Sequence, residues 1–231
     1  IKYGSKELDK IYNRSFCRKP KVISRVARII EDVRLDGDEA LVRYTKKYDK
    51  VKLSPKQIRS SQAEISGAYQ NISPDFVSSL KLVIENVTNF YKRQIKKDWN
   101  IKNKDGVFLG EQFSPIESVG VYVPGGQAPL VSTVYMTVLP AKIAGVKRIS
   151  LATPPDKSGN INPHILAAAD LLKVDEIYKI GGAQAISALA FGTKTVSRVD
   201  KIVGPGNAYV TEAKRQLYGY VDIDMLAGPT E

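Results

Sequence analysis

The apolar positions at the start of the chain recur with helical spacing. Over residues 21–33 they fall every three or four residues, and Gly37 offers a stop. A second helix is predicted to follow at once, capped by Asp38 and closed by Asp49. The chain is therefore expected to begin with a pair of amphipathic helices.

Capping residues mark two further helix starts. Ser61 and Glu64 have the spacing of a capping box, which predicts a short helix. Ser73 as cap and Pro74 as first helical residue predict a longer helix, whose apolar positions continue to Tyr91. The first segment is thus predicted to be helical, with lysines on its polar faces.

Strands are predicted from Trp99 onward. Lys104-Asp105-Gly106 is a hairpin-type turn that leads into an apolar run. Beyond Ser118 the chain repeats a short β-branched run, a loop rich in glycine or proline, and a helical pattern. The predicted strands are 119–123, 148–152, 176–180, 201–203 and 221–224, and the helical stretches lie near 130–144, 163–172, 184–191 and 207–217.

This alternation decides the fold class. Strands separated by a helix pair in parallel through right-handed crossovers, so we expect an open α/β sheet. The change from helices to alternating elements places a domain boundary near residue 121.

The loops that follow the predicted strands are the candidate ligand sites, because ligands bind at the carboxyl ends of parallel strands. These loops are rich in glycine, which lets backbone N–H groups approach a phosphate closely. They cover residues 124–129, 153–155, 181–184, 204–207 and 227–230. Several such loops at one edge indicate a nucleotide site.

The usual dinucleotide fingerprint is absent. Gly204 and Gly206 have its first spacing, but Tyr209 stands where the third glycine belongs. No Gly-Lys-Ser/Thr ending of a phosphate loop occurs, which argues against a nucleoside triphosphatase.

Three polar residues beside the glycines are the candidate ligand contacts: Tyr122, Gln184 and Asn207. A phenol at a strand end can bond a ribose or phosphate, although it can also be an ordinary half-buried sheet tyrosine. The two amides stand at helix starts, where capping is the alternative role. The only histidine, His164, has no partner for a catalytic triad or a zinc site.

Composition narrows the class of protein. An apolar content of 43% supports a globular chain, and the single cysteine, Cys17, excludes a disulfide framework and fits the cytoplasm. The most apolar stretch, residues 131–146, falls short of the roughly 20 residues of a membrane span. The net charge of +11 is spread over helix surfaces, so we expect no nucleic-acid partner and no membrane.

The ends of the sequence suggest a partial chain. It starts at Ile1 without an initiating methionine, and it stops at Glu231 directly after a predicted strand. We therefore interpret it as an amino-terminal fragment.

Several long sequence words closely resemble the histidinol dehydrogenase family. They are GVYVPGGQAPLVSTV from Gly120, IGGAQAISALAFGT from Ile180 and VDKIVGPGNAYVTEAKRQ from Val199, with VRLDGDEALVRYTKKYD from Val33 and IDMLAGPTE from Ile223 on either side. The resemblance covers roughly residues 20–231.

The resemblance implies a cytoplasmic, homodimeric enzyme that needs zinc and uses NAD to oxidise L-histidinol to L-histidine through the aldehyde. By similarity Tyr122, Gln184 and Asn207 contact NAD, and Thr230 stands where the family has a serine that touches the substrate. Residues 1–121 would then be helices and the first part of an incomplete first α/β domain. Residues 122–231 would be the second, Rossmann-like and NAD-binding domain.

The family's zinc ligands and proton-transfer residues are expected beyond residue 231. No catalytic residue and no metal ligand is therefore assigned in this chain, and we expect it to be inactive alone. The alternative is a stand-alone, non-catalytic dinucleotide-binding module. A nucleic-acid-binding role lacks any supporting motif, and an aldehyde dehydrogenase-like enzyme would need a cysteine after the sheet, whereas Cys17 precedes it.

Overall fold

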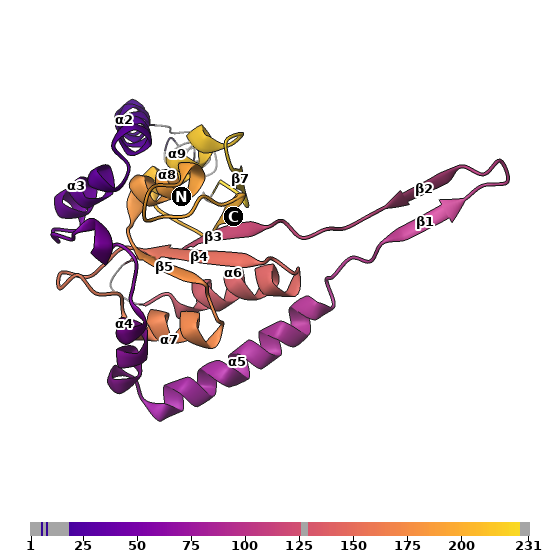
Figure 1. The fold of residues 1–231 in the computed structure, drawn as a ribbon, viewed down its shortest axis with the longest axis horizontal. Coiled ribbons are helices and arrows are strands. Elements are labelled where there is room, and N and C mark those ends of the chain that lie inside the picture. Colours follow the sequence, from indigo (N-terminus) through magenta and orange to yellow (C-terminus); the bar gives the residue numbers. More distant parts are fainter. Residues whose placement is uncertain (1–5, 7, 9–18, 126–128, 227–231) are drawn as a thin grey trace.

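A five-stranded parallel sheet forms the centre of the computed structural model, which describes residues 6, 8, 19–125 and 129–226 (Figure 1). Its strands are β3 (Ser118–Tyr122), β4 (Arg148–Thr153), β5 (Glu176–Lys179), β6 (Lys201–Val203) and β7 (Asp222–Ile223). All five lie within one or two residues of their predicted positions. The predicted open, parallel, Rossmann-like sheet is thus confirmed.

The order of the strands is β5-β4-β3-β6-β7, and every neighbouring pair is parallel. The chain starts at the central strand β3, moves outward through β4 and β5, and then returns to the other side of β3. This reversal is the topological switch point of a doubly wound sheet, where a crevice opens between the carboxyl ends of the two diverging strands. Here those strands are β3 and β6.

The two faces of the sheet have separate hydrophobic cores, because side chains alternate along each strand. Val121 and Leu151 point into the core beneath one pair of helices, whereas their neighbours Tyr122 and Ala152 point into the other. The first pair is α6 (Val131–Ile143) and α7 (Pro163–Leu171), and the second is α8 (Gly182–Phe191) and α9 (Ala208–Leu217).

The helices of the first segment form an outer layer on both sides. α2 packs on α8 and α9, α3 on α8, α4 on α7, and α5 on α6 (Figure 1). Their bounds are α2 (Pro20–Asp36), α3 (Asp38–Tyr48), α4 (Gln62–Ala68) and α5 (Pro74–Lys92), with short 3-10 turns at Pro55–Gln57 and Tyr69–Asn71. Within the described ranges, no helix is both long and apolar enough to cross a bilayer.

Most of the predicted helix ends are confirmed. Gly37 separates α2 from α3 with a φ of 55°, and Ser61 and Glu64 form the capping box of α4. Ser73 caps α5 by accepting from the Phe76 N–H. The predicted cap at Asp38 is wrong, because Gly37 occupies the N-cap position. The Asp38 carboxylate instead accepts from the Thr195 hydroxyl and N–H, which ties α3 to the loop before β6.

The predicted hairpin is confirmed as strands β1 (Trp99–Lys102) and β2 (Phe108–Glu111), which pair antiparallel. It projects far from the sheet (Figure 1), and every residue of both strands is exposed. The hairpin leads back into β3. This strand contains residue 121, near which the sequence predicts the boundary between the two domains. A two-stranded ribbon has little stability by itself, and Trp99, Ile101, Phe108 and Leu109 leave apolar side chains exposed along it.

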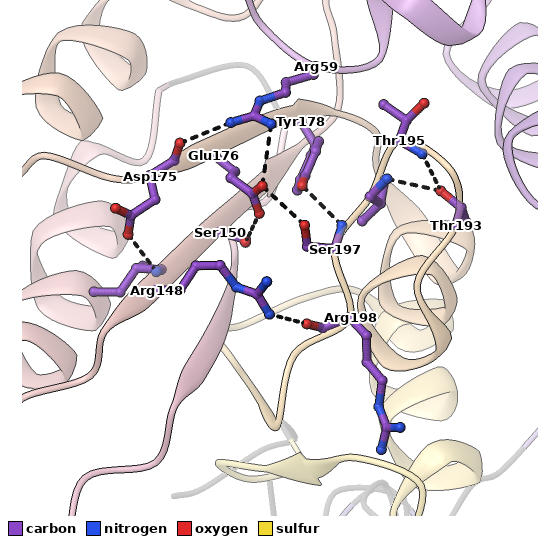
Figure 2. A network of polar contacts seen from close by, with 12 residues as sticks. Arg59, Arg148, Ser150, Asp175, Glu176, Tyr178, Thr193, Thr195, Ser197 and Arg198 are labelled. Atoms are coloured by element: carbon purple, nitrogen blue, oxygen red, sulfur yellow. Dashed lines mark hydrogen bonds and ion pairs between the residues drawn. The ribbon is translucent and has the colours of Figure 1, made fainter.

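A network of polar contacts closes the amino-terminal edge of the sheet (Figure 2). The Glu176 carboxylate accepts from the hydroxyls of Ser150 and Ser197 and pairs with Arg59 at 3.4 Å, and the Tyr178 hydroxyl accepts from the Ser197 N–H. Burial alone would raise the pKa of Glu176, but these hydrogen bonds and Arg59 lower it on balance. This carboxylate is therefore charged and fully engaged in holding the fold.

Candidate functional site

A cavity of about 700 Å³ lies at the opposite, carboxyl-terminal edge of the sheet. Its walls come from the loops after β3, β4 and β6, from the start of α8, and from α2 and the end of α3. The volume lies within the range of small-molecule sites. The cavity occupies the switch point between β3 and β6, where the fold predicts a ligand.

Tyr122 ends the central strand and contributes its phenol to the cavity wall. The side chain is only 3% exposed, and its hydroxyl accepts a hydrogen bond of 3.0 Å from the Gly182 N–H. Burial, and to a smaller extent the charge of Asp49, raise the pKa of Tyr122 to about 12, although the Gly182 bond opposes the shift. The phenol therefore stays protonated and keeps a hydrogen to donate.

Gln184 lies in the first turn of α8 and lines the same cavity. It does not cap its helix, because Gly181 is the N-cap and no side chain bonds there. Its Oε1 atom lies 2.9 Å from the point where a side chain on Gly182 would begin, so the amide folds back over the start of α8. At 2% exposure it is buried at the base of the cavity.

Asn207 caps its helix, which is one of the two roles that the sequence left open. Its Oδ1 atom caps α9 by accepting from the N–H groups of Tyr209 and Val210 at 2.9 and 3.2 Å. The residue also lines the cavity. Capping uses only the oxygen, so the two hydrogens of Nδ2 are available to a ligand.

The loop that carries Asn207 is held by an ion pair between a buried lysine and a partly exposed aspartate. The ammonium of Lys214, on α9, donates to the Gly204 carbonyl and pairs with Asp224, while the other oxygen of Asp224 accepts from the Gly204 N–H. Lys214 is 2% exposed. β6, α9 and the end of β7 are thereby fixed to one another beside the loop that carries Asn207.

The glycines of these loops serve close packing as well as access for a ligand. A Cβ atom on Gly125 or Gly181 would lie 2.3 or 2.5 Å from the Pro154 side chain, which packs between them. One on Gly204, where φ is +112°, would lie 2.2 Å from the Tyr122 carbonyl oxygen. The glycine-rich loops thus allow the ends of four strands, β3, β4, β5 and β6, to lie close together.

Two charged residues of the helical first segment, which sequence reasoning did not select, also line the cavity. Asp49, the C-cap of α3, has an Oδ2 atom that is buried and has no hydrogen-bond partner among the described residues, and burial raises its pKa to about 6. Arg25, on α2, bonds the Tyr209 hydroxyl at 3.0 Å. Sequence spacing does not identify Asp49 or Arg25 as site residues, because both come from helices that precede the repeating strand–loop–helix pattern.

The remaining candidates do not join this group. Thr230 and Cys17 lie outside the described residues. The His164 ring packs edge-on against the Phe76 ring, with 4.5 Å between the ring centroids, and His164 does not line the cavity. Across the described ranges, no three histidine, cysteine, aspartate or glutamate side chains gather closely enough to hold a metal ion.

The fold and the site together define a class of protein. A doubly wound α/β sheet with a cavity of this size at its switch point is typical of dinucleotide-binding domains. A family model for histidinol dehydrogenase matches residues 13–231. The chain belongs to the histidinol dehydrogenase family.

Individual relatives agree with this assignment. Histidinol dehydrogenase from Clostridium acetobutylicum is 46% identical over 228 residues, which are 99% of this chain and 52% of that protein. The Listeria innocua enzyme is 52% identical over 91% of this chain and 49% of its own length. The crystal structure of histidinol dehydrogenase from Elizabethkingia anophelis superimposes with a TM-score of 0.87 at 44% identity, covering 92% of this chain and 49% of that one. The chain therefore spans about half the length of the relatives it matches.

The close contact between Gly204 and Tyr122 makes a first prediction. Gly204→Ala should destabilise the fold by roughly 3 kcal/mol, because the new methyl group meets a backbone carbonyl and alanine disfavours this φ. Chemical denaturation measures the change. Gly67→Ala is the matched control: it lies in α4 with nothing within 4 Å of the new methyl, and a gain of about 0.5 kcal/mol is expected. Equal stability of the two variants would contradict this account.

The raised pKa of Asp49 makes a second prediction. The folded state holds this proton more tightly than the unfolded state, whose pKa is near 3.8, so stability is present at low pH and is lost as the pH rises to about 6. Asp49→Asn should therefore be more stable than the unaltered chain at pH 7.5, by on the order of 1 kcal/mol after solvent screening, and equally stable near pH 4.

Urea denaturation at both pH values checks this difference. Glu39→Gln removes the same charge from an exposed position of the same helix and should change stability little at either pH. A loss of stability in Asp49→Asn at pH 7.5 would show that the carboxylate supports the fold.

Proposed function

We propose that this chain forms the NAD-binding part of an enzyme that oxidises L-histidinol to L-histidine by way of L-histidinal, the last two steps of histidine biosynthesis. One observation carries the proposal. Tyr122, Gln184 and Asn207, which the family resemblance assigns to NAD, all line a single cavity at the switch point of the sheet. A shared cavity is what binding of one ligand by all three residues requires.

The chemistry of the three side chains suits a dinucleotide. Tyr122 is protonated and offers a hydrogen to a ribose or phosphate oxygen, while Asn207 offers its Nδ2 hydrogens from the start of α9. The buried Gln184 amide is available to hold a polar edge of the ligand. When bound, NAD supplies the acceptor for the hydride that leaves the substrate.

We propose that the zinc ligands lie in the part of the protein that corresponds to the half of the relatives not covered by this chain. Because no suitable cluster occurs among the described residues, we assign no chemical step of this chain to a metal. Thr230 remains the proposed substrate contact. The catalytic proton transfers are likewise assigned to the uncovered part.

The organisation of the whole protein is part of the same proposal. Residues 1–121 supply helices and the first part of a first domain, and residues 122–231 the NAD-binding domain. We also propose a cytoplasmic homodimer. The exposed hairpin β1–β2, with Trp99, Ile101, Phe108 and Leu109 all exposed, supports a contact with another chain, which sedimentation of the whole protein would reveal.

A stand-alone dinucleotide-binding module is the second candidate. The sheet, the helices on both of its faces and the cavity are all formed by the described residues. This chain could therefore bind a nucleotide without catalysing a reaction.

Titration with NAD in a calorimeter tests the cofactor site. Tyr122→Phe and Asn207→Ser should each weaken binding about threefold to tenfold, because each removes one hydrogen-bond donor. Serine at position 207 retains an oxygen that can cap α9, so the fold is preserved. Tyr218→Phe, at an exposed tyrosine away from the cavity, should leave the affinity unchanged. Unchanged affinity in both cavity variants would refute the assigned site.

Turnover separates the two candidate functions. Residues 1–231 should form no NADH from L-histidinol, even with added zinc, whereas a whole protein with the length of the relatives should form it steadily. Absorbance at the NADH band is the measurement. Turnover by residues 1–231 would mean that they contain catalytic groups, and NAD binding without turnover by the whole protein would favour the module.

A further inference from the structure

The cavity contains one carboxylate that the fold does not use. Among the described residues that line it, only Asp49 and Asp156 are acidic. Asp156 is engaged in its own turn, where its Oδ1 atom accepts from the N–H groups of Ser158 and Asn160 at 2.8 and 3.0 Å. The buried Oδ2 atom of Asp49 has no such donor within the described part of the chain.

The fold holds Asp49 in place at an energetic disadvantage. A buried carboxylate oxygen without a donor is unfavourable, and the next residue, Lys50, has a φ of +62°, a conformation that residues other than glycine rarely adopt. The Lys50 ammonium does not compensate the carboxylate, because it donates to the carbonyl of Lys47. Such local strain often accompanies a binding site.

We propose that Asp49 is a specificity-determining residue that accepts hydrogen bonds from the vicinal hydroxyls of a ribose in the bound dinucleotide. A ribose diol provides two neighbouring donors, which match the two oxygens of one carboxylate. Dinucleotide-binding folds with the usual glycine fingerprint place an acidic residue on the ribose in this way. In this chain, where that fingerprint is absent, the acid comes from the end of α3 and meets the cavity beside Tyr122.

The surroundings of Asp49 are consistent with this role. Its charge is one of the causes that raise the pKa of Tyr122, so the carboxylate and the phenol are close enough to interact. Arg25, the cation that lines the cavity, bonds Tyr209 and lies over its ring at 5.9 Å. The guanidinium is thus bonded to Tyr209 and not to the Asp49 carboxylate, which suits a ligand with both hydroxyl and phosphate groups.

The inference rests on the proposed NAD site, and its experiment separates the two. NAD and NADP are titrated into the unaltered chain, Asp49→Asn, Glu39→Gln and Tyr122→Phe. The Asp49→Asn substitution keeps the size of the side chain but removes its charge and one acceptor oxygen, so NAD affinity should fall about tenfold or more. Glu39→Gln removes an exposed charge from the same helix and should bind NAD as the unaltered chain does.

NADP identifies the ribose that is bound. If Asp49 binds the adenosine ribose, its charge repels the 2′-phosphate of NADP, so the unaltered chain binds NAD more tightly than NADP. Asp49→Asn should then bring the two affinities closer together. If it holds the nicotinamide ribose, the substitution weakens NAD and NADP equally. Unchanged NAD affinity in Asp49→Asn, with weaker binding in Tyr122→Phe, would overturn the inference and leave the NAD site standing. Unchanged affinity in both variants would remove the site itself.

Discussion

The contact between Gly204 and the Tyr122 carbonyl is the constraint on which the site depends. β3 and β6 diverge at this point, and the chain leaves both strands toward the same cavity. Glycine at 204 allows the loop after β6 to lie directly against the end of β3, and Lys214, which donates to the Gly204 carbonyl and pairs with Asp224, fixes that loop. This contact therefore sets where Tyr122 and Asn207 lie relative to each other at the cavity.

Two carboxylates at opposite edges of the sheet are held differently. At the amino edge, Glu176 receives hydroxyl donors and an arginine, and its pKa is lowered. At the carboxyl edge, Asp49 has a buried oxygen without a donor, and its pKa is raised to about 6. One arrangement stabilises the fold, and the other lowers stability at neutral pH. An arrangement that is unfavourable in the free protein is understandable where a ligand supplies the missing donors.

The sequence predicts most of the fold because its signals are local. Periodicity and capping residues locate the strands, the hairpin and nearly every helix, and strands alternating with helices dictate a parallel sheet. The cap of α3 was misplaced because Asp38 has the residue type of a cap, yet its carboxylate bonds Thr195, more than 150 residues away. Local propensity cannot anticipate such a partner.

The difference between local signals and contacts distant in sequence also explains how much of the candidate site was predictable. Tyr122, Gln184 and Asn207 follow strands or begin helices, so the rule that ligands bind at strand ends was enough to select them. Asp49 and Arg25 reach the cavity only because α2 and α3 pack against α8, a contact between segments about 150 residues apart. In sequence, Asp49 has the features of a helix end and Arg25 those of a solvated arginine. Their position beside Tyr122 and Tyr209 is a product of tertiary packing, which places a carboxylate and a guanidinium in the cavity of a sheet that lacks the usual fingerprint.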